Sequence, residues 1–600
     1  MKTIFTQFRI VFFMLITGLF TINCGGGGGG GAPAGGDGGT NLSKDASLSG
    51  LSLSHGSLDQ LIQADLFEYT ATVSFLISSV TVSAVTSHNK ASLNLNGDQL
   101  DTSTGQLKLE LIEGENNITV EVTAEDGSTR NTYIIVVTRQ SKAEFIQQAY
   151  LKASNPDKFD DFGFRVALSG DTLVVGAYRE DGDTNSDGIE EGANNDANHA
   201  GVVYVFERTD GNWVQQAYLK GSNTEGGLVF GDRFGWSIDV DEDTLVVGAA
   251  YEDGSASSDG MFNEMLVDND DEPNAGAVYV FVRNSGVWTQ QAYLKAINAE
   301  AGDLFGWSVG IAGDTVMIGA VGESGTKSSD GKLSSDKDDD GATGAGAVYV
   351  FSRKGTEWKQ IEYLKAENAG ELDRFGYDVD IEANTLVVSA VGEKGDANSK
   401  VGAYNDNEGK DTGAVYVFTL AEGVWDQTHY LKAKDAKTKD AFGQSVAIND
   451  DTLVVGAPGK DGRKGAAYIF NRDDSNWLYS VTLSASNAEA GDLFGYSVDI
   501  DGNSLVISAV SEGGDVNSTI EASNNDAPES GAAYLYVRSG DVWEQQVYVK
   551  ASNPDDKDFF GFSVGISGDT LVVGANGEAS ADGVQSDNNA AGAGAVYVFQ

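Results

Sequence analysis

The chain has 600 residues and a formal net charge of −51, from 90 acidic and 39 basic side chains. A surface this acidic repels nucleic acids and anionic lipids, so neither is expected as a partner. Hydrophobic residues make up 40% of the chain and aromatic residues 10%, which is enough to build folded cores. We therefore expect two or three folded units rather than a disordered acidic chain.

The first residues have the pattern of an export signal. Lys2 and Arg9 flank the start of an apolar run at 10–22 that is too short to span a membrane comfortably. Cys24, the only cysteine, follows this run and opens a stretch of seven glycines. Residues 1–24 thus resemble the signal of a bacterial lipoprotein, which implies lipidation at Cys24 and an exported chain at the outer membrane or cell surface. Membrane contact would then occur only through this anchor, while ordinary cleavage leaving a free thiol is the alternative.

Residues 25–45 are rich in glycine and predict a flexible tether. From 46 to 140 the pattern changes to short segments in which apolar and polar residues alternate, such as 69–73, 79–85 and 118–127. Six or seven such segments, separated by turn residues, predict a β-sandwich. The sequence GENNITVEVTAEDG resembles bacterial cadherin-like sandwich domains. Calcium sites of cadherins lie between tandem domains, so the resemblance of this one domain does not imply them.

Residues 143–600 contain seven copies of one sequence. Each copy has four apolar segments, of the form FGxSV, TLVVGA, GAVYVF and WxQQxYLKA. The two middle segments are apolar at nearly every position, which predicts strands covered on both faces, as in a blade that lies between two other blades. The Phe-Gly pairs begin at Phe162, Phe234, Phe305, Phe375, Phe442, Phe494 and Phe560.

The array begins with the fourth segment of a copy, at 145–153, and ends on the third segment of another, at 594–599. Such an array is completed when its first strand pairs with its last hairpin and closes a ring. The sequence therefore predicts an all-β chain, in which a small β-sandwich precedes a seven-bladed β-propeller with four-stranded blades, closed by the N-terminal strand.

Two charged positions are repeated around this ring. An Asp stands two residues before each Phe-Gly pair, and because no reaction needs one catalytic residue seven times, we interpret these side chains as acceptors for nearby backbone N–H groups. A Lys closes the fourth segment in six copies, with Ser484 in the remaining one, and we interpret it as a charge that protects an exposed edge strand. The aspartates are Asp160, Asp232, Asp303, Asp373, Asp440, Asp492 and Asp558.

These residues resemble the FG-GAP repeat of integrin α-subunit propellers, in its bacterial form, over residues 145–600. The resemblance implies a calcium loop of the form D-x-D-x-D-G in the hairpin before the TLVVGA strand, but hairpins such as 169–172 are too short to surround an ion. The acidic residues lie instead in the next loop of each copy. Two sets are candidate Ca²⁺ ligands, and polar loops without an ion are the alternative: Asp336, Asp338 and Asp340, and Asp181, Asp183, Asn185 and Asp187.

The sequence contains no motif that indicates catalysis. None of the four histidines has a partner at metal-binding spacing, and neither a nucleophile elbow nor a phosphate loop is present. We expect a surface-anchored, non-enzymatic binding or adhesion protein that presents propeller loops to a protein or glycan. A secreted propeller enzyme acting on polysaccharide and a structural envelope protein are the alternatives. Arg165 stands where other copies carry Ser or Asp, and we interpret it as variation between copies.

Overall fold

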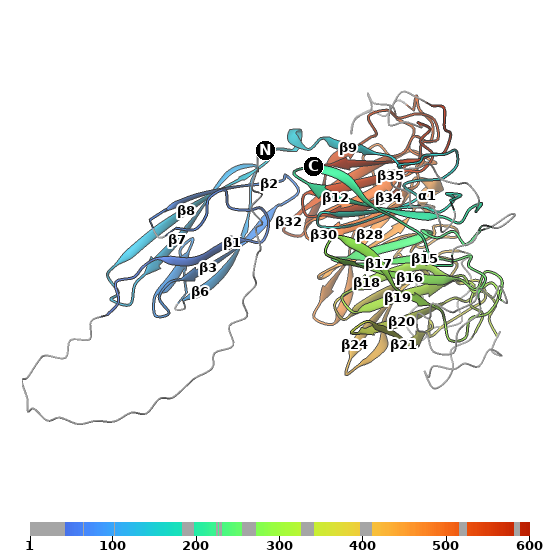
Figure 1. Cartoon of the computed structure of the whole chain (residues 1–600), viewed down its shortest axis with the longest axis horizontal. Helices are drawn as coiled ribbons and strands as arrows, with labels where there is room; N and C mark the ends of the chain where they lie inside the picture. Colours follow the sequence, from blue (N-terminus) through green and yellow to red (C-terminus); the bar gives the residue numbers. More distant parts are fainter. Residues whose placement is uncertain are drawn as a thin grey trace, which may run out of the picture.

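The computed structural model contains two β-units, a sandwich and a propeller, that lie side by side (Figure 1). The residues that it describes are 42–63, 65–100, 103–182, 197–223, 226, 231–254, 272–325, 341–395, 411–514, 525–580 and 588–600.

The N-terminal unit is a sandwich of two sheets, as the alternating pattern predicts. One sheet has the order β1 (Leu48–Leu53), β3 (Ser79–Thr86), β6 (Thr104–Glu110); the other has the order β2 (Glu68–Val73), β8 (Arg130–Arg139), β7 (Gly114–Thr123), β4 (Ser92–Leu95), β5 (Asp98–Leu100). Only β2 and β8 are paired in parallel among these described strands. Every second side chain faces inward, and Tyr69, Val82 and Tyr133 are fully buried between the sheets.

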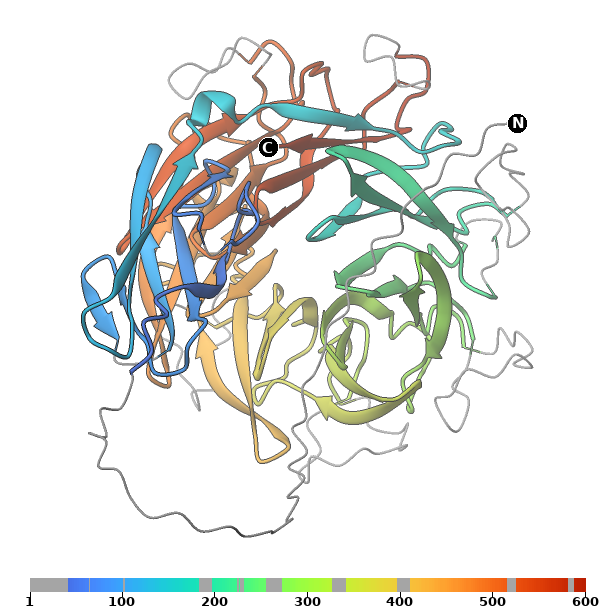
Figure 2. The ribbon, with the colours of Figure 1, turned by 60° about the vertical axis from the view of Figure 1, so that its left-hand side comes forward.

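The C-terminal unit consists of seven antiparallel sheets of four strands, arranged around a common centre (Figure 2). We number these blades 1 to 7 along the chain. Blades 1 to 3 are β10 (Arg165–Ser169), β11 (Thr172–Ala177), β12 (Val202–Thr209) and β13 (Asn212–Leu219); β14 (Ser237–Asp241), β15 (Thr244–Ala249), β16 (Ala277–Asn284) and β17 (Val287–Leu294); and β18 (Phe305–Ala312), β19 (Thr315–Ala320), β20 (Ala347–Lys354) and β21 (Glu357–Leu364).

The remaining blades repeat this order from the innermost strand to the outermost. Blades 4 to 6 are β22 (Phe375–Glu382), β23 (Thr385–Ala390), β24 (Ala414–Ala421) and β25 (Val424–Leu431); β26 (Val446–Asn449), β27 (Thr452–Ala457), β28 (Ala466–Asp473) and β29 (Asn476–Leu483); and β30 (Phe494–Asp501), β31 (Ser504–Ala509), β32 (Ala532–Ser539) and β33 (Val542–Val549). Blade 5 also holds a single helical turn, α1 (Lys460–Arg463), and a short 3₁₀ turn, η1 (Lys142–Glu144), precedes the propeller.

Blade 7 closes the ring with strands from both ends of the array. It contains β34 (Phe560–Ser567), β35 (Thr570–Ala575), β36 (Ala595–Phe599) and, outermost, β9 (Gln147–Leu151). Antiparallel pairing places Tyr597 opposite Tyr150 and Val596 opposite Leu151. The predicted sevenfold closure by the N-terminal strand is therefore confirmed.

Neighbouring blades touch through buried side chains and through backbone. The second strand of each blade is buried or nearly so along its whole length, as its unbroken apolar sequence predicts. In blade 1, the backbone of Gly163 passes so close to blade 7 that a Cβ atom there would lie 2.5 Å from the carbonyl oxygen of Ala595. Its φ of +88° also favours glycine, so this position combines two requirements that only glycine meets.

The sandwich packs against one face of the propeller. Phe75 and Leu76, in the segment between β2 and β3, share a hydrophobic cluster with Phe145 and with blade 7 residues such as Phe599. The hydroxyl of Ser504, the first residue of β31, donates a 2.8 Å hydrogen bond to the carbonyl oxygen of Leu76. This face carries the short hairpin turns, so the face with the longer connections points away from the sandwich (Figure 1). We call the second face the loop face.

Candidate functional site

The repeated aspartates close tight turns at the loop face. Asp160 Oδ2 accepts a 2.7 Å hydrogen bond from the backbone N–H of Asp157, three residues earlier, and the same bond occurs at five other copies. Burial raises the pKa of Asp160 and of Asp558 to about 7. Asp232 is buried too. These side chains are placed to hold backbone rather than to meet a ligand.

The residue between each Asp and its Phe has left-handed backbone geometry. These residues are Asp161, Arg233, Leu304, Arg374, Ala441, Leu493 and Phe559, with φ values between 54° and 63°. Such a conformation is unfavourable for side chains other than glycine and is maintained by the surrounding structure. The following Phe is fully buried in every copy, and the Phe162 ring meets the Tyr204 ring edge-on at 5.2 Å. The FG-GAP turn is therefore a rigid element at each blade.

The lysines after the fourth strand do not protect an exposed edge, and that interpretation is wrong. Each one turns inward to a buried glutamate that follows the second strand of the same blade. The lysine stands where the fourth strand ends at the loop face. Its ammonium group donates to the Glu carboxylate and to a backbone carbonyl oxygen, as Lys220 does to Glu180 and Gly201. The pairs are Lys152–Glu578 at 2.9 Å, Lys220–Glu180 at 2.8 Å, Lys295–Glu252 at 2.7 Å, Lys365–Glu323 at 2.5 Å, Lys432–Glu393 at 2.7 Å and Lys550–Glu512 at 3.1 Å.

In blade 5, different residues form the buried ion pair. In blade 1, the Tyr204 hydroxyl donates to Asn155, and the Asn155 amide donates to Glu180. In blade 5, Asp435 stands at the Asn position, Lys460 at the Glu position and Ser484 at the Lys position. Lys460 Nζ lies 2.7 Å from Asp435 Oδ2, and the Tyr468 hydroxyl donates to Asp435 Oδ1 at 2.7 Å. Each arrangement combines one positive and one negative charge.

The innermost strands surround a cavity of about 500 Å³ on the propeller axis. At its loop-face end, aromatic side chains contributed by six blades form what we call the aromatic layer. Adjacent rings lie close together, with centroids 5.0 Å apart for Trp236 and Trp307 and 5.0 Å apart for Phe164 and Phe562. Blade 5 contributes Gln444, whose amide donates to the Tyr377 hydroxyl at 3.2 Å. The layer consists of Phe164, Trp236, Trp307, Tyr377, Tyr496 and Phe562.

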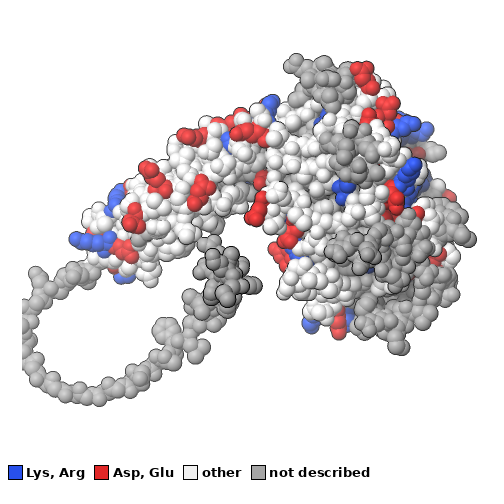
Figure 3. Space-filling view, turned by 45° about the horizontal axis from the view of Figure 1, so that its top comes forward, with Lys and Arg blue, Asp and Glu red and all other residues white. Residues whose placement is uncertain are grey.

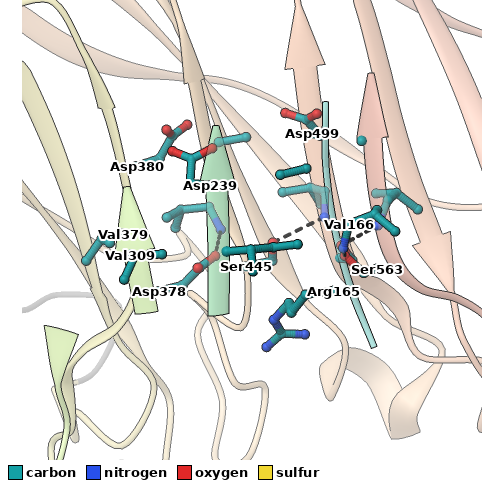
Figure 4. A pocket seen from close by; sticks show the side chains of 18 of the residues that line it. Arg165, Val166, Asp239, Val309, Asp378, Val379, Asp380, Ser445, Asp499 and Ser563 are labelled. Atoms are coloured by element: carbon teal, nitrogen blue, oxygen red, sulfur yellow. Dashed lines mark hydrogen bonds between the residues drawn. The ribbon is translucent and has the colours of Figure 1, made fainter. Parts of the chain in front are cut away.

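In six blades, the residue after the aromatic-layer position bonds its blade to the following one. Ser563 Oγ accepts the backbone N–H of Val166 at 3.1 Å, and Asp378 Oδ2 accepts that of Val446 at 2.8 Å. Arg165 occupies the same position in blade 1, but its guanidinium lies 4.8 Å from the centroid of the Phe164 ring. Figure 4 shows its side chain extending on the side of the cavity opposite Asp239, Asp380 and Asp499. Arg165 thus places a cation beside the aromatic layer.

Deeper in the cavity, blades 2, 4 and 6 contribute Asp239, Asp380 and Asp499 (Figure 4). The intervening blades carry only Ala or Gly at this position, which leaves room for the carboxylates. Each carboxylate accepts a backbone N–H from the next blade, as Asp239 does from Ile311 at 2.8 Å. Burial raises the pKa of Asp239 and Asp380 to about 7 and that of Asp499 well above its usual range. These carboxylates join blades, and within the described residues no group of three or more His, Cys, Asp or Glu could hold a metal ion.

The remaining sequence-predicted positions can be placed only in part. Asp181 accepts the backbone N–H of His199 at 2.7 Å and so closes the base of its loop. Asp183, Asn185, Asp187, Asp336, Asp338, Asp340 and Cys24 lie outside the described residues. Within the described part of the chain, no helix has the length and hydrophobicity needed to cross a membrane.

Two features of this site were missed by sequence reasoning although the sequence carried a signal for each. The aromatic layer is formed by the residues directly after the Phe-Gly pairs, and this position is aromatic in six of seven copies. The buried glutamate stands three residues after the apolar second strand in six copies, the same six that have the Lys.

Comparison with known proteins agrees with this architecture. Residues 49–140 match the cadherin-like beta sandwich domain. Seven FG-GAP repeats match at 145–206, 213–261, 288–351, 358–418, 425–470, 477–536 and 543–599.

Three curated proteins share shorter stretches with the chain. A protein of Evansella cellulosilytica, named as a membrane protein, is 30% identical over 105 residues, which is 18% of this chain and 16% of the relative. Human integrin alpha-11 is 38% identical over 72 residues, 11% of this chain and 6% of the integrin, and mouse integrin alpha-2 is 28% identical over 93 residues, 14% and 8%. The chain thus spans less than a fifth of the length of each relative. With the matches covering most of residues 145–599, the chain belongs to the FG-GAP repeat family, as a seven-repeat propeller behind a cadherin-like sandwich.

Proposed function

We propose that this protein is a binding or adhesion protein of the cell surface, whose loop face receives a protein or glycan ligand at the aromatic layer. The observation that carries this proposal is a cavity of about 500 Å³ that six aromatic side chains line at the loop face. Concave sites with many aromatic residues and a few polar groups are typical ligand sites, and Arg165, Asp378 and Gln444 supply the polar groups here.

The placement of the sandwich supports this orientation. Because Phe75 and Leu76 pack on the opposite face, the sandwich does not cover the aromatic layer. In sequence, the sandwich lies between Cys24 and the propeller that carries this layer. An anchor at Cys24, the glycine-rich tether and the sandwich would then serve as a stalk for the loop face. Membrane attachment, export and position at the outer membrane or cell surface are parts of this proposal.

A binding role fits the cavity better than acid–base catalysis. Asp239, Asp380 and Asp499 come from three different blades, and both carboxylate oxygens of each accept a hydrogen bond from a backbone N–H group. A general acid or base instead needs a carboxyl group free to reach the substrate. We therefore propose that the protein binds without turning over its ligand.

An array of glycans and surface proteins, probed with the full-length chain, tests the proposal. The variant Trp236→Ala/Trp307→Ala should lose the captured ligand, whereas Phe67→Ala, which removes a half-exposed ring from the sandwich, should retain it. Equal binding by both variants, or turnover of a polysaccharide by the unmodified chain, would overturn the proposal.

Calcium is a further part of the proposal, because Asp336, Asp338 and Asp340 have the spacing of a calcium loop. Equilibrium dialysis with Ca²⁺ should show binding that the triple change Asp336→Asn/Asp338→Asn/Asp340→Asn removes. If the triple variant binds as much Ca²⁺ as the unmodified chain, these residues are not the ligands.

A further inference from the structure

The loop face carries an unexpected group of cations at blade 5. Acidic side chains are spread over the described surfaces of the sandwich and the propeller (Figure 3), in keeping with the net charge of −51. At blade 5, however, five exposed cations come from two segments, the connection that leads into β26 and the connection between β27 and β28. We call these residues the basic patch: Lys434, Lys437, Lys439, Arg463 and Lys464.

The two segments of the basic patch lie against each other. Lys437 Nζ is 3.1 Å from Asp461 Oδ1, and the backbone N–H of Gly459 donates to the carbonyl oxygen of Asp440 at 3.1 Å. Beneath them, the buried Lys460 pairs with Asp435 at 2.7 Å and with Asp440 at 3.6 Å. The patch is therefore built on an ordered base rather than on independent loops.

Three cations of the patch are available to a ligand. Lys439, Arg463 and Lys464 have no carboxylate within 4 Å among the residues that the structure describes. The exposed acids of these two segments are Asp435 and Asp461. Asp435 and the buried Asp440 already pair with Lys460, and Asp461 already pairs with Lys437. The buried Asp492 of blade 6 adds one more negative charge near Lys464, so the exposed side of the patch keeps an excess of positive charge.

The basic patch is specific to blade 5. Where this blade has Lys434, Lys437 and Lys439, blade 6 has Ser486, Glu489 and Gly491, and blade 7 keeps only the last lysine, with Ser552, Asp555 and Lys557. The connection after the second strand is also short here, with β27 ending at 457 and β28 beginning at 466, whereas β11 ends at 177 and β12 begins at 202. The segment that is long and acid-rich in other blades is thus replaced by a short, basic one.

The patch belongs to the same blade as the polar gap in the aromatic layer. Blade 5 is the blade that contributes Gln444 in place of an aromatic ring, and Gln444 lies four residues after Asp440 along the chain. The rim of the cavity is therefore polar on the side of the basic patch and aromatic elsewhere. A linear ligand could cross the patch, pass Gln444 and place its end among the aromatic rings near Arg165.

We propose that blade 5 is the docking surface for an acidic polysaccharide, a chain that carries carboxylate or sulfate groups, with sugar rings seated in the aromatic layer. This inference rests on the proposed binding function of the loop face. Charge complementarity at the patch supplies the anion contacts, and the flat faces of Trp and Tyr suit sugar rings. The net charge of −51 repels a polyanion elsewhere on the protein, which confines its contact to the basic patch. The aromatic layer beside the patch then favours a chain of sugars, and binding of a nucleic acid is an outcome of the test.

The test compares binding of a carboxylated polymer (polygalacturonate), a sulfated polymer (chondroitin sulfate), neutral dextran and single-stranded DNA to the full-length chain at low and high salt. We expect one of the acidic polysaccharides to bind, with affinity that falls as salt rises. The variant Lys439→Gln/Arg463→Gln/Lys464→Gln should weaken this binding by about tenfold or more, the sum of three exposed ion contacts. The control Lys108→Gln/Lys354→Gln/Lys359→Gln removes the same charge from exposed positions elsewhere and should bind normally.

Several outcomes would overturn the inference. These are equal weakening by both triple variants, binding of dextran or DNA as tight as that of the acidic polysaccharides, or no binding of either acidic polymer. If Trp236→Ala/Trp307→Ala abolishes capture of some other ligand while neither acidic polymer binds, the proposed function stands and the docking surface at blade 5 does not.

Discussion

The closing strand gives the sharpest test of the architecture, because it supplies one residue of a buried ion pair. Lys152 follows β9 and places its ammonium 2.9 Å from Glu578, which lies in the same blade but 426 positions away in sequence. Their side chains are 7% and 1% exposed. Lys152→Ala would leave the Glu578 carboxylate buried without its cation.

The expected cost follows from this burial. Removing one partner of a buried pair costs about 3–5 kcal/mol. Glu578 keeps hydrogen bonds from Ser580 and Asn553, so we expect the lower end of this range, about 3 kcal/mol. The double change Lys152→Met/Glu578→Gln removes both charges and should lie within about 1 kcal/mol of the unmodified chain.

Urea unfolding followed by circular dichroism measures the change in the free energy of unfolding. Lys158→Ala is the matched control, since this exposed lysine stands six residues later and should change stability by no more than about 0.5 kcal/mol. If Lys152→Ala behaves like Lys158→Ala, or if the double variant loses as much as Lys152→Ala, then the closing strand is not held by a buried ion pair and our reasoning fails.

Three more predictions test other parts of the structure. Burial raises the pKa of Asp160, Asp303 and Asp558 to about 7, above the value of 3.8 expected in the unfolded chain. The folded state therefore holds these protons more tightly than the unfolded state. The stability that this adds is complete below pH 4 and is lost as the pH rises through 7. The thermal midpoint should therefore be higher at pH 5 than at pH 8, with a smaller difference in Asp558→Asn; an unchanged difference would contradict this origin. Trp358→Ala should cost about 3–5 kcal/mol in urea unfolding because the ring is 2% exposed, whereas Val424→Ala, 49% exposed, should cost little. Phe75→Ala/Leu76→Ala should detach the sandwich from the propeller and raise the radius of gyration in X-ray scattering; an unchanged radius would show that these contacts do not hold the two units together.

Patterns that depend on local burial were readable from the sequence. The unbroken apolar run TLVVGA is buried because a blade covers each face of its strand, and the alternating run of β3 has one buried face. The closure could also be predicted, because the array lacks one strand at its end and has one to spare at its start. In each case the signal lies within a few residues or within the repeat period.

Contacts between different segments were not readable in the same way. Lys220 and Glu180 lie 40 positions apart, and a lysine on an outermost strand is equally consistent with an exposed edge. Only its absence at Ser484, together with Lys460 in place of Glu, marks the pair in the sequence. No repeat or periodic pattern in the sequence predicts that Phe75 and Leu76 pack against the propeller.

Blade 5 shows why the loop face can vary while the ring stays intact. In six blades the buried cation comes from the end of the fourth strand and the anion from the loop after the second strand; in blade 5 the cation comes from that loop and the anion from the incoming connection. Both arrangements keep the buried charge balanced, and an unbalanced charge in this position would be costly. Because the balance can be met by either arrangement, the loop of blade 5 is free to be short and basic, while the other six blades each contribute an aromatic ring to the cavity. The asymmetry that we assign to ligand binding therefore arises at the one blade where the internal charges are exchanged.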